Sequence, residues 1–192
     1  LDLIQNSDSN ELQELINQAL SKFPEKIIEY KNGKVGLLRK MPNSIPPKTY
    51  IDAGGFKGNV DRWQQVEYAP EGGNILRVNA GACDVGTGAY EGRRDNGFVL
   101  VNIHGVTPET ETTTHYIWTI CTNAPRESGV PEKLFDQFFL TISEDEVALA
   151  AQQQRIIDLP YLPFLGIASD GAVNRARMLL DQLHELEKTS PV

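Results

Sequence analysis

Residues 98–122 read FVLVNIHGVTPETETTTHYIWTICT, two β-branched and apolar runs on either side of a short polar stretch. Such runs are typical of β-strands, and the residues between them, Pro108–Glu111, predict a four-residue hairpin loop. Counting outward from that loop places His104 directly opposite His115, with Cβ atoms roughly 5 Å apart. The two histidines would then share one face of the hairpin.

Side chains alternate between the two faces of a strand, so Phe98, Leu100, Asn102 and His104 are expected on one face. That face is apolar with two polar groups, a combination that suits the wall of a ligand cavity. We therefore take these four residues as candidate substrate-binding residues. From spacing alone, a histidine that is merely satisfied in the core or at a sheet edge is the more common case.

Further strands are expected upstream of this hairpin. Asn32-Gly33 favours a type I′ turn between two short strands, and the Pro- and Gly-rich stretch 42–58 is interpreted as a loop. The strands expected from the sequence upstream of residue 98 are Lys26–Tyr30, Val35–Arg39, Val60–Tyr68 and Asn74–Cys83. Before them, apolar residues at helical spacing between Leu12 and Phe23 predict one helix, in an arm that spans residues 1–24.

Downstream of the hairpin the apolar spacing becomes helical. One helical stretch is expected over 134–142, and Ser143 with Glu146 forms a capping box that opens a second helix, which Pro160 ends. Gly171 precedes a terminal helix. A helix, an antiparallel meander of roughly five to seven strands and then helices indicate an α+β domain over residues 25–192, with helices on one face of a curved sheet.

Composition excludes several classes of protein. The chain has 192 residues, 40% of them hydrophobic, which argues against disorder, and a net charge of −8, which disfavours nucleic acid and anionic membrane surfaces as partners. No apolar run is long enough for a membrane span. Cys83 and Cys121 are interpreted as two buried thiols in a reducing compartment, the cytoplasm. The chain begins at Leu1, so it can be a fragment.

Common catalytic motifs are absent from the sequence. The string Gly86–Gly92 follows a strand but is expected to open no helix, so it is interpreted as a turn and not as a phosphate cradle. Carboxylates at 144–146 suit the first turn of a helix. Asp145, however, shares a helical face with Ala148 and Leu149, so it can point inward.

Taken together, six strings in this order resemble the C-terminal catalytic domain of vanillate O-demethylase oxygenase subunits, the Rieske non-haem iron oxygenases related to dicamba monooxygenase. The resemblance runs from about Glu25 to the C-terminus. The matching strings are Val60–Gln64, Gly86–Gly92, His104–Thr112, His115–Trp118, Glu144–Glu146 with Gln152–Gln154, and Asp170-Gly171 before an Arg-rich helix.

The resemblance implies a helix-grip fold, in which a Bet v 1-like sheet wraps around a long C-terminal helix. In the family, a Rieske [2Fe–2S] domain passes electrons to a mononuclear Fe(II) held by two histidines and one carboxylate. Family members demethylate or hydroxylate small aromatic acids, work with a reductase, and are often trimers. By resemblance Asp145 is the carboxylate ligand, expected to point inward near His104, and His104 contacts the aromatic substrate.

The chain also departs from the family pattern. Neither Cys83 nor Cys121 belongs to a Rieske motif, and the segment that carries the two iron-binding histidines does not precede the match. We therefore expect no iron and no cluster bound by this chain alone. Three hypotheses follow, in this order: the C-terminal part of an oxygenase, a stand-alone helix-grip domain that binds a small hydrophobic or aromatic ligand, and an enzyme with a new metal site made of His104, His115 and Asp145.

Overall fold

The computed structural model describes residues 25–30, 33–70, 74–162, 166 and 170–189. The helix expected between Leu12 and Phe23 lies outside these residues. The strands are β1 (Glu25–Tyr30), β2 (Lys34–Ser44), β3 (Val60–Ala69), β4 (Ile75–Asp84), β5 (Phe98–Pro108) and β6 (Thr114–Thr122). The helices are α2 (Lys48–Gly54), α3 (Val130–Asp158) and α4 (Gly171–Thr189), with single 3₁₀ turns η1 (Ala89–Glu91) and η2 (Arg126–Ser128).

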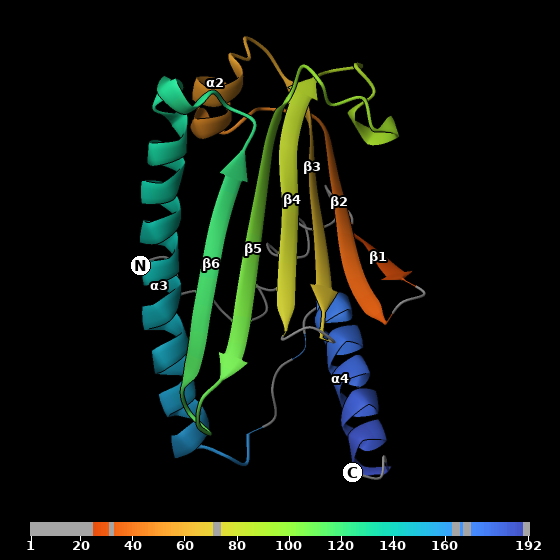
Figure 1. Ribbon diagram of the computed structural model, residues 1–192, viewed down its shortest axis with the longest axis vertical. Coiled ribbons are helices and arrows are strands. Elements are labelled where there is room, and N and C mark those ends of the chain that lie inside the picture. The colour runs from red at the N-terminus through yellow and green to blue at the C-terminus, as the bar shows by residue number, and fades with distance from the viewer. Residues whose placement is uncertain (1–24, 31–32, 71–73, 163–165, 167–169, 190–192) are drawn as a thin grey trace, which may run out of the picture.

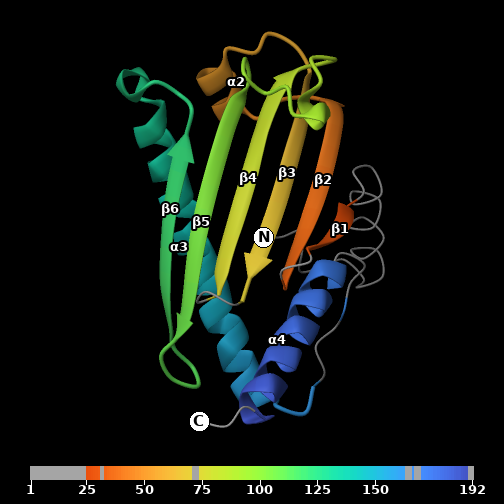
Figure 2. The same ribbon diagram turned by 45° about the vertical axis from the view of Figure 1, so that its right-hand side comes forward.

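The six strands form one antiparallel sheet in which every strand pairs with its neighbour in sequence, in the order β1-β2-β3-β4-β5-β6 (Figure 1). Figure 2 shows the same meander with α3 running along the β6 side and α4 lying at the end of the sheet near β2. The α+β, helix-grip architecture expected from the sequence is confirmed. The longest helix is α3, and α4 follows it.

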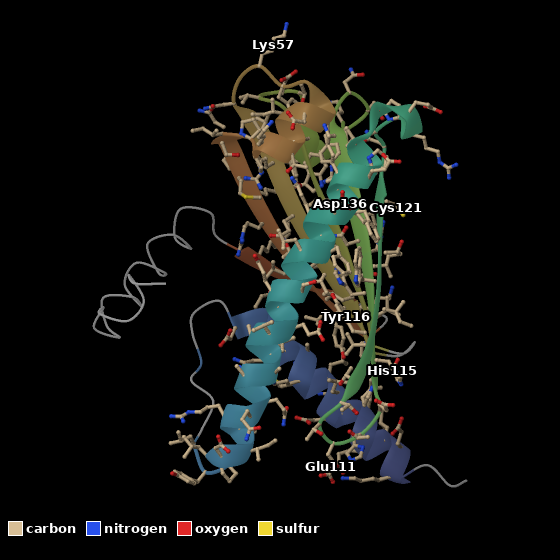
Figure 3. The ribbon with its side chains drawn as sticks, turned by 90° about the vertical axis from the view of Figure 1, so that its left-hand side faces the viewer. Lys57, Glu111, His115, Tyr116, Cys121 and Asp136 are labelled. Atoms are coloured by element: carbon tan, nitrogen blue, oxygen red, sulfur yellow. The ribbon has the colours of Figure 1, made fainter. Side chains whose placement is uncertain are left out.

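Helix α3 lies on one side of the sheet, which we call the α3 face, and Figure 3 shows it in front of the strands. The core on this face joins the ends of three strands to α2 and α3. Its fully buried members are Phe56, Val60, Ala82, Phe98, Leu100, Val130 and Leu134. Tyr50 of α2 packs edge-on against Phe98, with ring centroids 4.9 Å apart. These contacts anchor the start of α3 over β5.

The stretch 42–58, expected to be a loop, contains the end of β2 and the helix α2. Pro47 precedes the first turn of α2, where the missing N–H of a proline costs little. Gly55 ends the helix in the left-handed conformation (φ 69°), and its N–H donates to the Ile51 carbonyl. Prolines and glycines that indicated a loop thus mark the two ends of a short helix.

The predicted break at Ser143 is also wrong, because α3 is continuous over 29 residues. The Ser143 hydroxyl does not cap a helix. It donates to the Phe139 carbonyl one turn earlier, at 2.8 Å, as serines within helices commonly do. The helix ends at Asp158, before Pro160, where the sequence predicted its end.

The register of the β5–β6 hairpin differs from the prediction. Thr107 lies opposite His115, and His104 lies opposite Trp118. The loop comprises five residues, 109–113, and the Thr110 hydroxyl oxygen stabilises it by accepting the Thr113 backbone N–H at 3.0 Å. A shift by an odd number of residues moves every side chain of β6 to the other face.

The opposite face of the sheet carries a second, smaller core of Trp63, Cys83 and Ala89. Gly86 and Gly88 have positive φ angles (80° and 87°), which lets the chain turn back over this face. The turn is followed by the single 3₁₀ turn η1, a short helical element that the sequence did not predict. Helix packing and this turn therefore cover opposite sides of the same sheet.

Candidate functional site on the α3 face of strand β5

The four candidate residues of β5 lie together on the α3 face, as the alternation predicted. Phe98, Leu100, Asn102 and His104 are all buried, whereas Ile103 between them is 39% exposed. Their neighbours across the strands are apolar: Val78 and Ile120 flank Asn102, and Trp118 lies beside His104. Two polar side chains are thus buried within an otherwise apolar strip.

Helix α3 covers this strip through aromatic contacts with β6. The ring of Trp118 lies 5.2 Å from that of Phe135 and 6.2 Å from that of Phe138, measured between centroids. Since Trp118 is the cross-strand neighbour of His104, the histidine lies in the wedge between sheet and helix. The role of this strip in substrate binding stays a prediction.

His104 is held by Tyr116 of β6. The Tyr116 hydroxyl oxygen lies 2.5 Å from His104 Nδ1, and the two rings are nearly parallel, at 8° with centroids 5.8 Å apart. Figure 3 shows Tyr116 on the side of β6 that faces α3. One ring nitrogen of His104 is therefore committed to Tyr116, which leaves Nε2 to meet a ligand.

The surroundings keep both members of this pair uncharged. Burial lowers the pKa of His104 below its ordinary value of 6.5, because the imidazolium is poorly solvated there. Burial raises the pKa of Tyr116, and the negative charge of Asp145 raises it further. At neutral pH the pair is a neutral imidazole and a neutral phenol, joined by one hydrogen bond.

Asp145 lies on α3 near this pair. The expectation that Asp145 points inward is wrong, because the residue is exposed. It is nevertheless close enough to Tyr116 for its charge to act on the phenol. Tyr116 is thus the residue that contacts the candidate histidine and also feels the charge of the candidate carboxylate. The assignment of Asp145 as an iron ligand stays a prediction.

Asn102 is the least satisfied polar residue of the strip. Its side chain is 4% exposed, and its Oδ1 has no hydrogen-bond partner among the described residues. A buried acceptor without a donor typically costs about 1–3 kcal/mol. An asparagine at this position therefore destabilises the fold unless another group donates a hydrogen bond to its Oδ1.

His115 lies away from the candidate site. It is on the face opposite His104, with 63% of its side chain exposed, and its Nε2 lies 3.5 Å from a Glu109 carboxylate oxygen. The expected His104–His115 pair is wrong, and with it the hypothesis of a metal site made of His104, His115 and Asp145. No three His, Cys, Asp or Glu side chains within the described ranges gather closely enough to hold a metal ion.

The described residues therefore do not fit the family's iron by themselves. Asp145 is one carboxylate, and the nearest histidine has one nitrogen bonded to Tyr116. Tyr116 is the functional neighbour that sequence reasoning missed. The register expected for the hairpin placed His115 on the face of His104 and Tyr116 on the other face, whereas the structure has the reverse.

A separate cleft of about 230 Å³ lies on the opposite face of the sheet. Its lining residues are Gln65, Glu67, Arg77, Asn79 and Arg94. Here the polar groups bond to one another: Asn79 Oδ1 accepts the Trp63 indole N–H at 2.8 Å, and the Arg94 guanidinium stacks 4.1 Å from the Trp63 ring. This arrangement is a structural network, distinct from the strip on β5.

Comparisons of the sequence and of the fold with known proteins all find oxygenases. The sequence profile described as the vanillate O-demethylase oxygenase C-terminal domain matches residues 13–186. The toluene-4-sulfonate monooxygenase system iron-sulfur subunit of Comamonas testosteroni is 32% identical over 157 residues, 81% of this chain and 45% of that protein. The vanillate O-demethylase oxygenase subunit of a Pseudomonas species is 24% identical over 132 residues, 68% of this chain and 40% of that protein.

Among solved structures, dicamba monooxygenase bound to 3,6-dichlorosalicylic acid is similar with a TM-score of 0.72. The similarity covers 90% of this chain and 50% of that one, at 20% sequence identity, and it shows the shared fold. The chain spans about half the length of the curated relatives it matches.

Proposed function

The chain belongs to the family of vanillate O-demethylase oxygenase C-terminal domains, and from this premise we propose that it forms the substrate-binding part of the catalytic domain of a Rieske-type oxygenase. The observation that supports the proposal is the strip on β5, where Asn102 and His104 are buried among apolar side chains. Asp145 of α3 lies close enough to Tyr116, the partner of His104, for its charge to raise the pKa of that phenol. The reaction is the hydroxylation or O-demethylation of a small aromatic compound.

The residues of this chain would divide the work of binding between them. Phe98 and Leu100 supply an apolar surface for an aromatic ring, and His104 supplies a polar contact whose orientation Tyr116 fixes. The cover of α3 over Trp118 keeps water away from this contact. Exclusion of water strengthens polar contacts to a ligand and favours an aromatic over a hydrophilic one.

Asp145 would serve as the carboxylate ligand of a mononuclear Fe(II). Iron of this kind activates O₂ with electrons from an iron-sulfur cluster. The described residues supply one of three protein ligands, so the two histidines, and the cluster with them, would come from outside these residues. A reductase and a trimeric assembly complete the proposal as partners.

A reducing cytoplasm would suit such redox chemistry. Cys83 and Cys121 are both free thiols; Cys83 is buried as expected, whereas Cys121 is exposed and its expected burial is wrong. Within the described residues, no helix combines the length and the apolar character that crossing a bilayer requires.

The test is to assay the intact protein, supplied with Fe(II), a reductase system and O₂, against a panel of small aromatic acids. Oxygen-dependent formation of a hydroxylated or demethylated product, with stoichiometric iron by metal analysis, is the expected result. Ligand binding without iron and without turnover would instead favour a stand-alone helix-grip binding domain.

A further inference from the structure

Asn102 has a buried side-chain acceptor that no group within the residues described satisfies. It lies on β5 two residues before His104, on the α3 face, and its flanking residues on β4 and β6 are Val78 and Ile120. Neither can donate a hydrogen bond from its side chain. Within the described part of the chain, Oδ1 is both inaccessible to water and without a donor.

Asn79 shows what a purely structural asparagine looks like in the same sheet. It lies on the neighbouring strand β4 and on the opposite face, and its Oδ1 accepts the Trp63 indole N–H at 2.8 Å and an Arg94 N–H at 3.4 Å. Both residues are amides within central strands. Asn79 Oδ1 accepts from two donors, whereas Asn102 Oδ1 has none in the described part of the structure, even though Asn102 is only 4% exposed.

An unsatisfied amide is a costly way to fill this position. Leucine has the same branching and the same number of side-chain heavy atoms, and it would pack against Val78 and Ile120 with no orphaned acceptor, so stability alone favours an apolar residue here. A donor supplied by a ligand removes the penalty only when the ligand is bound. Such an arrangement makes the site select ligands that carry the donor over analogues that lack it.

We propose that Asn102 is a specificity-determining residue whose Oδ1 accepts a hydrogen bond from the substrate, so that the site selects aromatic compounds that carry a hydroxyl or amide N–H donor. This inference rests on the proposed function and adds the class of substrate to it. His104 Nε2, on the same face, would hold a second polar group of that substrate, while Phe98 and Leu100 contact its ring.

The experiment compares matched probes on the intact protein. Dissociation constants are measured by calorimetry for 4-hydroxybenzoate against 4-methylbenzoate, and for 3-hydroxybenzoate against 3-methylbenzoate. Each pair has nearly equal size and differs in the donor. For at least one pair the hydroxyl compound should bind about tenfold more tightly, the effect of one satisfied buried acceptor.

Two variants separate recognition from folding. Asn102→Leu should reduce the tenfold preference to within about twofold and should not lower the unfolding temperature, because it removes an orphaned acceptor. Asn79→Leu, the matched control, should lower the unfolding temperature, because it leaves the Trp63 and Arg94 donors unpaired, and should keep the tenfold preference.

Equal affinity of the wild-type protein for both members of both pairs would overturn the inference and leave the proposed function standing. So would an Asn102→Leu variant that retains the preference, or one that loses stability as Asn79→Leu does. If no benzoate binds the intact protein, the proposed function itself is contradicted, and the inference with it.

Discussion

On the face of the sheet opposite α3, Trp63, Asn79 and Arg94 bond and stack with one another, whereas on the α3 face Asn102 has no partner and His104 has one. The first group comes from β3, β4 and the segment before β5, and the second comes from β5. Asn102 and His104 are buried, whereas Asn79 and Arg94 are only partly buried. The difference separates a polar network that stabilises the fold from the polar groups that we propose contact a ligand. Substitutions on the two faces should therefore affect different measurements.

The largest effect on stability is expected for Trp63→Ala on the opposite face. Trp63 is 1% exposed, and its indole N–H donates to Asn79, so its removal leaves a large cavity. The free energy of unfolding, measured by denaturant titration, should fall by about 3–5 kcal/mol. Below the unfolding transition, affinity for aromatic ligands should stay unchanged. A loss of affinity in the folded variant would show that the two faces are coupled.

Asp145→Asn should change function without changing the fold. The residue is exposed on α3, so the unfolding midpoint should stay within the small range typical of surface substitutions. In the intact protein, iron content measured by metal analysis should drop, with at least about a 100-fold loss in iron affinity and turnover. The neighbouring Glu144→Gln is the control and should keep its iron. Full iron occupancy in Asp145→Asn would show that Asp145 is not an iron ligand.

Tyr116→Phe should weaken ligand binding by releasing the ring of His104. The lost hydrogen bond corresponds to about 1 kcal/mol, or roughly a fivefold rise in the dissociation constant for a bound aromatic acid. The control is Tyr90→Phe, whose hydroxyl donates to the Arg62 carbonyl at 3.1 Å and is distant from His104. It should lose comparable stability and no affinity. Equal affinity losses in the two variants would argue against a positioning role for Tyr116.

The smallest effect is a loss of stability in mild acid that depends on His104. Burial holds the folded-state pKa of His104 below 6.5, so the unfolded chain binds a proton more readily than the folded chain. The stabilisation is therefore present above the unfolded-state value and decreases as the pH falls through 6.5 toward the folded-state value. Unfolding titrations between pH 7.5 and 5 should show a steeper loss for the wild-type protein than for His104→Gln. Identical slopes would indicate that His104 is solvated.

The sequence predicted the strands well because each carries its own pattern of β-branched and apolar residues, and the alternation in β5 identified the buried strip correctly. What it could not provide is the pairing between strands. The wider hairpin depends on hydrogen bonds of Thr110 and Thr113 within the loop, which local propensity does not reveal. Because the register error was three residues, Trp118 and not His115 lies opposite His104, and Tyr116 instead of His115 lies on the α3 face.

The helix boundary predicted at Ser143 was wrong for a related reason. Ser143 and Glu146 have the spacing of a capping box, but the same residues are tolerated inside a helix when the serine bonds to the preceding turn. The structure shows that α3 continues through Ser143 to Asp158, which the local spacing did not predict. Likewise, the resemblance pointed to Asp145 and His104, whereas the unsatisfied state of Asn102 emerged only from the structure.

The strictly sequential meander has a consequence for how the molecule is made. Each strand finds its partner in the segment synthesised just before it, so the sheet can grow one hairpin at a time as the chain leaves the ribosome. Helix α3 follows the last strand, and Trp118 cannot be covered until Phe135 and Phe138 have emerged. Trp118, the cross-strand neighbour of His104, is therefore covered only after all six strands have been made, and the contact of α4 with β2 forms later still.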